Sequence, residues 1–183
     1  KRHPHIKLSV LEISSYDAIK RLNDGSIDIV LTPLDIKERF NTMESIDIYP
    51  TANIFCTSLN DPLAQQDSVT FQDIRQRPIA VLNSKLPVDW PLQIRLCTNT
   101  SSLIREAVSK GILCALLPQD FVRDWDDVAV LPFNPPQNCA VKAVWNKNLP
   151  HSSALQEFVD FLLEYFAAQG IVLPEEKIED DEI

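Results

Sequence analysis

The stretch HIKLSVLEISSYDAIKRLNDGSIDIVLTP, residues 5–33, decides the fold class of this 183-residue chain. Residues 5–13 alternate apolar and polar side chains and then become apolar, as in a strand buried in a sheet. Ser14 and Ser15 favour a helix N-cap, and residues 27–31 form a short apolar, β-branched run. The stretch therefore predicts strand, helix, strand. We expect the two strands to be parallel and joined by a right-handed crossover.

The rest of the chain repeats this alternation, which predicts an α/β fold with two Rossmann-like lobes. Strands are predicted at residues 46–58, 77–82, 92–98, 112–117, 128–131 and 139–145. Helices are predicted at residues 70–75, 101–110, 118–125 and 153–169, the third of them beginning at Pro118. Thr70 is the predicted N-cap of the first helix and Ser152 or Ser153 that of the last, and Gly25, Gly111 and Gly170 are predicted to end helices. The predicted buried stripe of the second helix is Leu103, Ile104, Ala107 and Val108, and that of the last is Leu155, Phe158, Val159, Leu162 and Phe166.

Two segments are predicted to connect the lobes as crossovers. Pro50 interrupts the strand at residues 46–58, which indicates an edge or crossover strand. Residues 134–138 (NPPQN) have the composition of a linker. The boundaries that follow place lobe I at residues 1–57 and 136–170, lobe II at residues 58–135, and an acidic tail at residues 171–183. Two connections imply a hinge with a cleft between the lobes.

The charge of the chain argues against direct nucleic-acid binding. The formal net charge is −9, and residues 175–182 carry −5 of it. An acidic surface repels a phosphate backbone. We expect the tail to be a solvated, disordered end, with a docking segment as the alternative.

The cysteines do not form a metal-binding pattern. No CxxC occurs, and three of the four cysteines lie in apolar runs that resemble strands. We expect buried free thiols in a reducing cytoplasm, with a redox pair as the alternative, and no metal. The four residues are Cys56, Cys97, Cys114 and Cys139.

Catalytic patterns are also missing from the sequence. His3, His5 and His151 lie at the edges of segments, away from any nucleophile. The three glycines do not assemble a phosphate loop or a dinucleotide fingerprint. The sequence predicts no enzyme and no cofactor.

Polar residues gather where predicted strands end and helices begin, in both halves of the chain. Hydroxyls, amides and free backbone N–H groups at a helix start favour anions or polar oxygens. Capping and turn formation is the simpler explanation for any one residue, but convergence in both halves favours an effector site between the lobes. The candidates are Ser14, Ser15, Thr32, Asn83, Ser84, Thr98, Asn99, Thr100 and Ser101.

Six short motifs, in this order and spacing, give the chain a family resemblance. They are PHIKL at residues 4–8, SS with AIKRL at residues 14–22, GSIDIV at residues 25–30, DPLA at residues 61–64, VTFQDI at residues 69–74, and GILCALLP at residues 111–118. Over residues 1–166 the chain resembles the effector-binding domain of LysR-type transcriptional regulators, which have the type II periplasmic-binding-protein fold. It departs from the family pattern at Leu113, where a second glycine is usual.

The resemblance also implies that elements are missing at the front. The family's domain begins with a further strand and helix before Pro4, and the full regulator begins with a winged helix-turn-helix and a linker helix. Without that strand and helix, a hydrophobic sheet face would be uncovered, and we expect a marginally stable or oligomeric product.

The resemblance implies a cytoplasmic sensor that binds a small polar or anionic effector in the interlobe cleft. DNA would be bound only through the absent N-terminal domain, and the assembly would be a homodimer or tetramer without a membrane partner. The alternative is a solute-binding protein of a transporter with the same fold, and an enzyme on that fold is a third possibility. A helix-turn-helix or a secretory signal peptide upstream of Lys1 would separate the first two.

Overall fold

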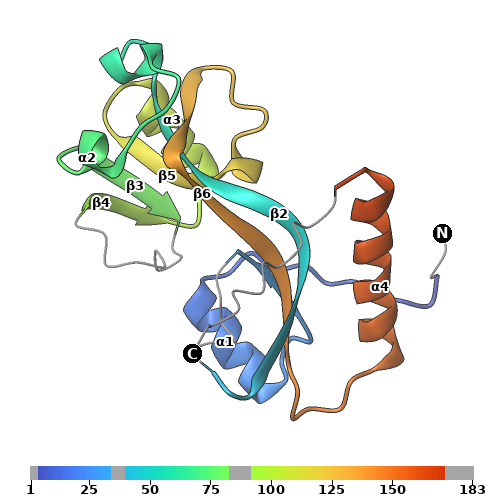
Figure 1. The fold of residues 1–183 in the computed structure, drawn as a ribbon. Coiled ribbons are helices and arrows are strands. Elements are labelled where there is room, and N and C mark those ends of the chain that lie inside the picture. The colour runs from blue at the N-terminus through green and yellow to red at the C-terminus, as the bar shows by residue number, and fades with distance from the viewer. Residues whose placement is uncertain (1–3, 34–39, 83–91, 172–183) are drawn as a thin grey trace, which may run out of the picture.

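Two long antiparallel strands, β2 (Met43–Ser58) and β6 (Val128–Asn146), connect the two lobes of the molecule (Figure 1). The computed structural model describes residues 4–33, 40–82 and 92–171. The β2–β6 ladder extends from the pair Met43 and Asn146 at one end to the pair Ser58 and Val128 at the other. Both lobes are therefore built on the same two strands.

The other strands add to this pair on either side, in the order β1-β6-β2-β5-β3-β4. In lobe I, β1 (Val30–Thr32) pairs antiparallel with β6. In lobe II, β5 (Cys114–Pro118) pairs antiparallel with β2. β3 (Pro78–Leu82) then lies between β5 and β4 (Gln93–Thr98), parallel to both. The result is a mixed sheet with helices, which confirms the predicted α/β class.

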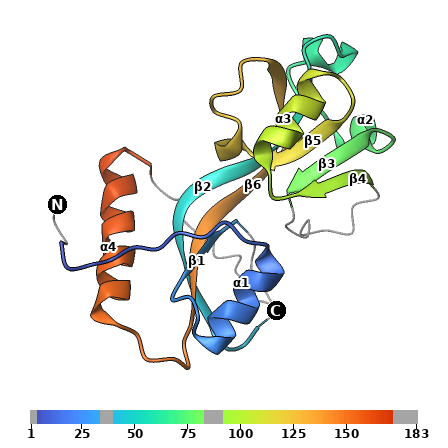
Figure 2. The same cartoon turned by 180° about the vertical axis from the view of Figure 1, so that it is seen from behind.

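The helices pack on both sides of this sheet. In lobe I, α1 (Ser15–Asp24) and α4 (Ser153–Ala168) lie on opposite sides of the β2–β6 pair (Figures 1 and 2). Lobe II carries the short α2 (Phe71–Ile74), α3 (Ser101–Ser109) and the 3-10 turns η2 (Pro62–Gln65) and η3 (Gln119–Phe121). Within the described ranges, no helix is long and apolar enough to cross a membrane.

The predicted start and stop signals of α1 and α4 are confirmed. Ser14 and Ser152 are the N-caps, and their hydroxyls accept hydrogen bonds from the N–H groups of Asp17 and Leu155. Gly25 ends α1 with a left-handed φ of 72°. A Cβ at Gly25 would also lie 3.3 Å from Leu149 Cδ1, so both the left-handed backbone and the close contact favour glycine at this position.

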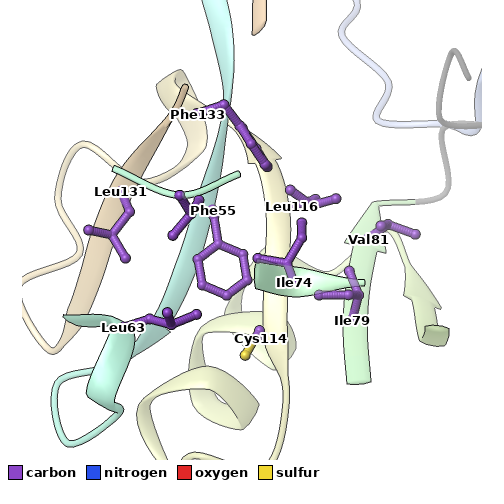
Figure 3. Packing of buried hydrophobic residues seen from close by; sticks show 10 residues of the cluster. Phe55, Leu63, Ile74, Ile79, Val81, Cys114, Leu116, Leu131 and Phe133 are labelled. Carbon is purple, nitrogen blue, oxygen red and sulfur yellow. The ribbon is translucent and has the colours of Figure 1, made fainter. Parts of the chain in front are cut away.

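Lobe II has a core on each face of its sheet, which explains its continuously apolar strands. Phe55 is fully buried in one cluster, with Leu63, Ile74 and Leu116 around it (Figure 3). Its neighbours Ile54 and Cys56 belong to the other cluster, beneath α3. Successive strand residues point to opposite faces, so both faces are filled.

Lobe I has a smaller core on the α1 side of the sheet. Leu22 from α1, Met43 from β2 and Val144 from β6 are almost completely buried together. On α4 the predicted stripe faces the sheet only loosely, and Val159 is the one member that is buried. Tyr49 of β2 stacks on Phe166 of α4, with ring centroids 4.4 Å apart.

The predicted strand at residues 5–13 is wrong. Residues 6–14 adopt no regular secondary structure, and Leu8, Val10 and Leu11 are exposed. Among the described strands β1 pairs only with β6, and that pairing is antiparallel, so the predicted parallel crossover is wrong as well. An alternating pattern favours an extended chain, but a β-strand also needs a second strand with which to form a ladder, and none of the described strands pairs with this segment.

The linker predicted at residues 134–138 is also wrong, although the chain does cross between the lobes there. These residues belong to β6, and β2 pairs with Pro132 and then with Gln137, so four residues lie outside the ladder. The two prolines among them therefore mark a bulge rather than a break. At Pro50, β2 has a partner on one side, where Pro50 pairs with Ala140 of β6. Strand β5 begins to pair with the other side of β2 only at Asn53. β2 is therefore the crossover strand that the proline predicted.

Three smaller predictions are wrong for reasons of packing. The helix predicted from Pro118 to Trp125 is only the three-residue turn η3. Leu103 is exposed on α3, because Ile104 and Val108 form its buried face. Cys97 is exposed because β4 is the edge strand of the sheet, although all four cysteines are free thiols as predicted.

An ion pair between Asp61 and Arg77 ties the turn after β2 to the start of β3. The Asp61 side chain is 14% exposed, and its carboxylate also accepts the Leu63 N–H at 2.9 Å. Burial acts to raise the pKa of Asp61, but the hydrogen bonds from Arg77 and Leu63 outweigh it and lower the pKa below its ordinary 3.8. The pair therefore favours the folded state wherever Asp61 is ionised.

Replacing Phe55 by alanine should lower the free energy of unfolding by about 3 to 5 kcal/mol, because the cavity cannot be refilled in a two-sided core. Urea denaturation measures the change. Phe161→Ala, at a residue that is 39% exposed, is the control and should cost much less. Equal losses would contradict the central position of Phe55.

Replacing Asp61 by asparagine should lower the free energy of unfolding by about 1 to 3 kcal/mol at pH 7. The folded pKa is depressed, so the stabilisation is present above 3.8 and is lost as the pH falls through the lower folded value. The difference from wild type should therefore shrink below pH 3.8 in urea titrations. Asp126→Asn, at a side chain that is 92% exposed, should show little difference at either pH.

Candidate functional site

The N-terminus of α3 carries four of the predicted site residues. Thr98 ends β4, and its hydroxyl accepts a hydrogen bond from the Thr100 N–H at 3.1 Å. Thr100 is the N-cap, yet its side chain makes no capping hydrogen bond, and the first turn of α3 contains no acidic residue. Asn99 and Thr100 are exposed, and Ser101 is the first helical residue. The positive end of this helix is therefore open to an anion.

The N-terminus of α1 is electrostatically different. Ser14 accepts the Asp17 N–H at 3.2 Å and donates its hydroxyl proton to the Asp17 carboxylate at 2.8 Å. The carboxylate in the first turn already balances the helix dipole. Ser14 is therefore occupied as a cap, and Ser15 follows it as the first helical residue.

Thr32 lies in a row of polar residues that crosses the lobe I sheet. It pairs with Lys142 of β6, which in turn pairs with Asp47 of β2. Thr32 is only 6% exposed. The Lys142 ammonium donates to the Asp47 carboxylate at 2.7 Å, and the Lys142 side chain is 20% exposed. The positive charge of Lys142 is thus fixed on the lobe I sheet.

This row lies on the α1 side of the sheet. Val144, two residues after Lys142, packs against Leu22 of α1. Residues i and i+2 of a strand point to the same face, so Lys142 is directed to that side. In both cartoon views, the N-terminal ends of α1 and α3 lie on the facing sides of the two lobes (Figures 1 and 2). Lys142 therefore lies on the face of the lobe I sheet that carries α1.

The structure thus places seven of the nine predicted site residues. Thr98 to Ser101 are contiguous in lobe II, while Ser14, Ser15 and Thr32 belong to lobe I. Asn83 and Ser84 lie outside the described residues. The sequence reasoning did not include Lys142 and Asp47. A lysine inside the run CAVKAVW and an aspartate inside IDI were the available signals, because charges inside apolar strands need a partner.

A second set of polar contacts, formed by Thr51, Asp120 and Arg123, connects β2 to η3. The buried Thr51 of β2 donates its hydroxyl proton to the Asp120 carboxylate at 2.7 Å, and Arg123 donates to the same carboxylate at 2.6 Å. Burial and then the Asp120 charge raise the pKa of Tyr49. These contacts hold η3 of lobe II against the strand that leads into lobe I.

Two of the four thiols, Cys56 and Cys139, are poorly suited to redox chemistry. Burial raises the pKa of Cys56 to about 12 and also raises the pKa of Cys139. Cys56 and Cys114 belong to clusters on opposite faces of the sheet. A reactive cysteine needs a lowered pKa. Among the described residues, no group of three or more His, Cys, Asp or Glu residues is arranged to hold a metal ion.

Similarity to solved structures identifies the fold. The C-terminal domain of a probable LysR family transcriptional regulator from Rhodococcus superposes with a TM-score of 0.72 at 17% identity, over 88% of this chain and 86% of that chain. The effector-binding domain of QuiR in complex with shikimate gives 0.77 at 20% identity, over 94% and 87%. The regulatory domain of MetR from N. meningitidis gives 0.74 at 14% identity, over 94% and 88%.

The family assignment comes from the sequence itself. No curated protein matches the chain significantly. The profile of the LysR substrate binding domain, however, matches residues 1–167, which is most of the chain. The chain therefore belongs to the LysR substrate-binding domain family, the ligand-sensing regulatory domains of LysR-type transcription regulators.

Proposed function

We propose that this domain senses a small polar anion, such as a hydroxylated carboxylate, bound between its two lobes. The uncapped N-terminus of α3 is the observation that carries the proposal. Its first turn has neither an acidic residue nor a capping bond from Thr100. An oxyanion placed there would accept hydrogen bonds from backbone N–H groups and would gain from the helix dipole.

Lys142 supports the same choice of charge from the other lobe. Its ammonium group is fixed by the ion pair with Asp47 and lies on the side of the sheet that carries α1. Its charge would attract an anion, and the neighbouring Thr32 hydroxyl suits a hydroxylated ligand. The site would therefore recognise the carboxylate mainly through lobe II and the polar body of the effector through lobe I.

The QuiR structure supports this ligand class by analogy. That effector-binding domain was solved with shikimate, which is a hydroxylated carboxylate. At 20% identity the similarity to QuiR supports the same fold. The preference for an anionic ligand is inferred from the residues of this chain.

The output would follow from the movement of two lobes about the β2–β6 crossover. We place lobe I at residues 1–57 and 136–170 and lobe II at residues 58–135, with effector binding between them biasing their relative position. DNA contact would belong to a winged helix-turn-helix of the regulator, since this chain carries a net charge of −9. A cytoplasmic homodimer or tetramer fits this role better than a transporter's solute-binding protein or an enzyme.

Small hydroxylated carboxylates should raise the melting temperature of the domain. At about 100-fold above the dissociation constant, binding contributes ~2.7 kcal/mol, or about 5 to 10 °C for a chain of this size. Differential scanning fluorimetry with shikimate and related acids measures the shift. Lys142→Gln should reduce the shift at equal concentration, while Lys7→Gln, on the exposed N-terminal segment, should leave it unchanged. Amides of the same acids giving equal shifts would contradict anion recognition.

Replacing Thr100 by valine should weaken effector binding by about 1 to 3 kcal/mol, or roughly five- to 150-fold, if its hydroxyl meets a buried ligand oxygen. Stability should hardly change, because the Thr100 side chain makes no capping bond.

Thr70→Val is the matched control for this variant. Thr70 forms a capping box with Asp73, so its replacement should cost about 0.5 to 2 kcal/mol of stability and leave affinity intact. Isothermal titration and urea denaturation separate the two effects. A Thr100→Val variant that loses stability but keeps its affinity would reduce Thr100 to a structural residue.

A further inference from the structure

Among the described strands, the connection between the lobes narrows to two at residues 49–52 of β2, which pair with residues 138–141 of β6. β5 joins the other side of β2 only from Asn53 onward, and the β2–β6 register shifts between Asn53 and Ile54. A two-stranded ribbon takes a larger twist than a wider sheet, so its ladder fixes the angle between the lobes less firmly. Contacts outside the ladder therefore have a large influence on that angle.

Tyr49, in this narrow stretch, contacts elements of both lobes. Its ring stacks on Phe166 near the end of α4, with centroids 4.4 Å apart, so Tyr49 points to the side of the sheet that carries α4 (Figures 1 and 2). Burial raises the pKa of Tyr49, and the negative charge of Asp120 and a hydrogen bond to it raise this pKa further. The phenol group therefore lies beside η3 of lobe II, while the ring lies against α4 of lobe I.

Asp120 is the lobe II side of this contact, and its side chain is only 17% exposed. Its carboxylate accepts the Thr51 hydroxyl at 2.7 Å and an N–H of Arg123 at 2.6 Å. Thr51 follows Tyr49 by two residues, so both side chains point to the same face of β2. Thr51 is 3% exposed, and a buried hydroxyl that loses its partner destabilises the protein. Separating η3 from β2 is therefore more costly than breaking an exposed hydrogen bond.

We propose that Tyr49, Thr51 and Asp120 form a latch that holds the two lobes in the orientation of this structure. A rotation of lobe II about residues 49–52 moves η3 relative to β2 and breaks the hydrogen bond from Thr51. The latch lies on the α4 side of the sheet, whereas Lys142 lies on the α1 side, so it is separate from the proposed effector site. The latch acts in the ligand-free domain, and its failure would leave the proposed binding of an anion untouched.

Residual dipolar couplings of the backbone N–H groups in the full chain test the latch, because they report the relative orientation of the lobes without added labels. In the wild-type chain, the couplings of both lobes should fit one alignment tensor calculated from this structure. Thr51→Val keeps nearly the same shape but lacks the hydroxyl, so its couplings should require a separate tensor for each lobe. Thr51→Ser keeps the hydroxyl and should behave as wild type.

Two further variants and a second measurement complete the test. Tyr49→Phe keeps the ring on Phe166 and loses only the phenol hydroxyl, so it should also separate the two alignment tensors, and it decides the question if Thr51→Val does not fold. Asp124→Ala, at an exposed carboxylate of lobe II, should change nothing. Amide hydrogen exchange at residues 49–52 should become about tenfold faster in Thr51→Val and stay unchanged in Thr51→Ser.

Two results would overturn the latch. If one tensor fits the couplings of Thr51→Val and Tyr49→Phe as well as those of wild type, the β2–β6 ladder alone fixes the orientation, even where the variants lose stability. If the wild-type couplings already require two tensors, the lobes move independently in spite of these contacts.

Discussion

The antiparallel ladder between β2 and β6 is the constraint on which the rest of the molecule depends. β1 attaches to β6 in lobe I, and β5 attaches to β2 in lobe II, so neither lobe has a sheet without the pair. The ladder is irregular next to Ile54, where four residues of β6 leave it, and the Thr51–Asp120 hydrogen bond braces the strand close by. In the described part of the chain, these two strands thus set the relation between the lobes.

Capping residues of the same chemical type serve different purposes at the two helix starts. Ser14 and Asp17 satisfy each other, so the positive end of α1 is already balanced. Thr100 leaves the start of α3 uncapped, and no acid lies in its first turn. The two helix starts differ because Asp17 lies three residues after the Ser14 cap, whereas α3 has no acidic residue in its first turn. This difference can be seen in the sequence. The position of Lys142 on the α1 side of the sheet, by contrast, depends on the pairing of β6 with distant strands.

The two lobes also differ in how their apolar residues are used. Lobe II fills both faces of its sheet, and Phe55 is completely enclosed. Lobe I buries one small cluster under α1 and leaves Leu31 and Ile46 on the other face partly exposed. The predicted strand at residues 5–13 failed in this lobe because pairing with a neighbour, rather than alternation, makes a strand. The predicted linker failed because β2 kept β6 paired on both sides of its prolines.

Local signals in the sequence determined the α/β class, the caps at Ser14, Thr70 and Ser152, the glycine stops and most strands, because these depend on a few neighbouring residues. They also indicated hydroxyls at the start of α3. The tertiary structure decided which strands pair, which face Lys142 occupies, and that Tyr49 stacks on Phe166 of α4. These features arise between residues far apart in the chain, where pairing and packing rather than local propensity set the outcome.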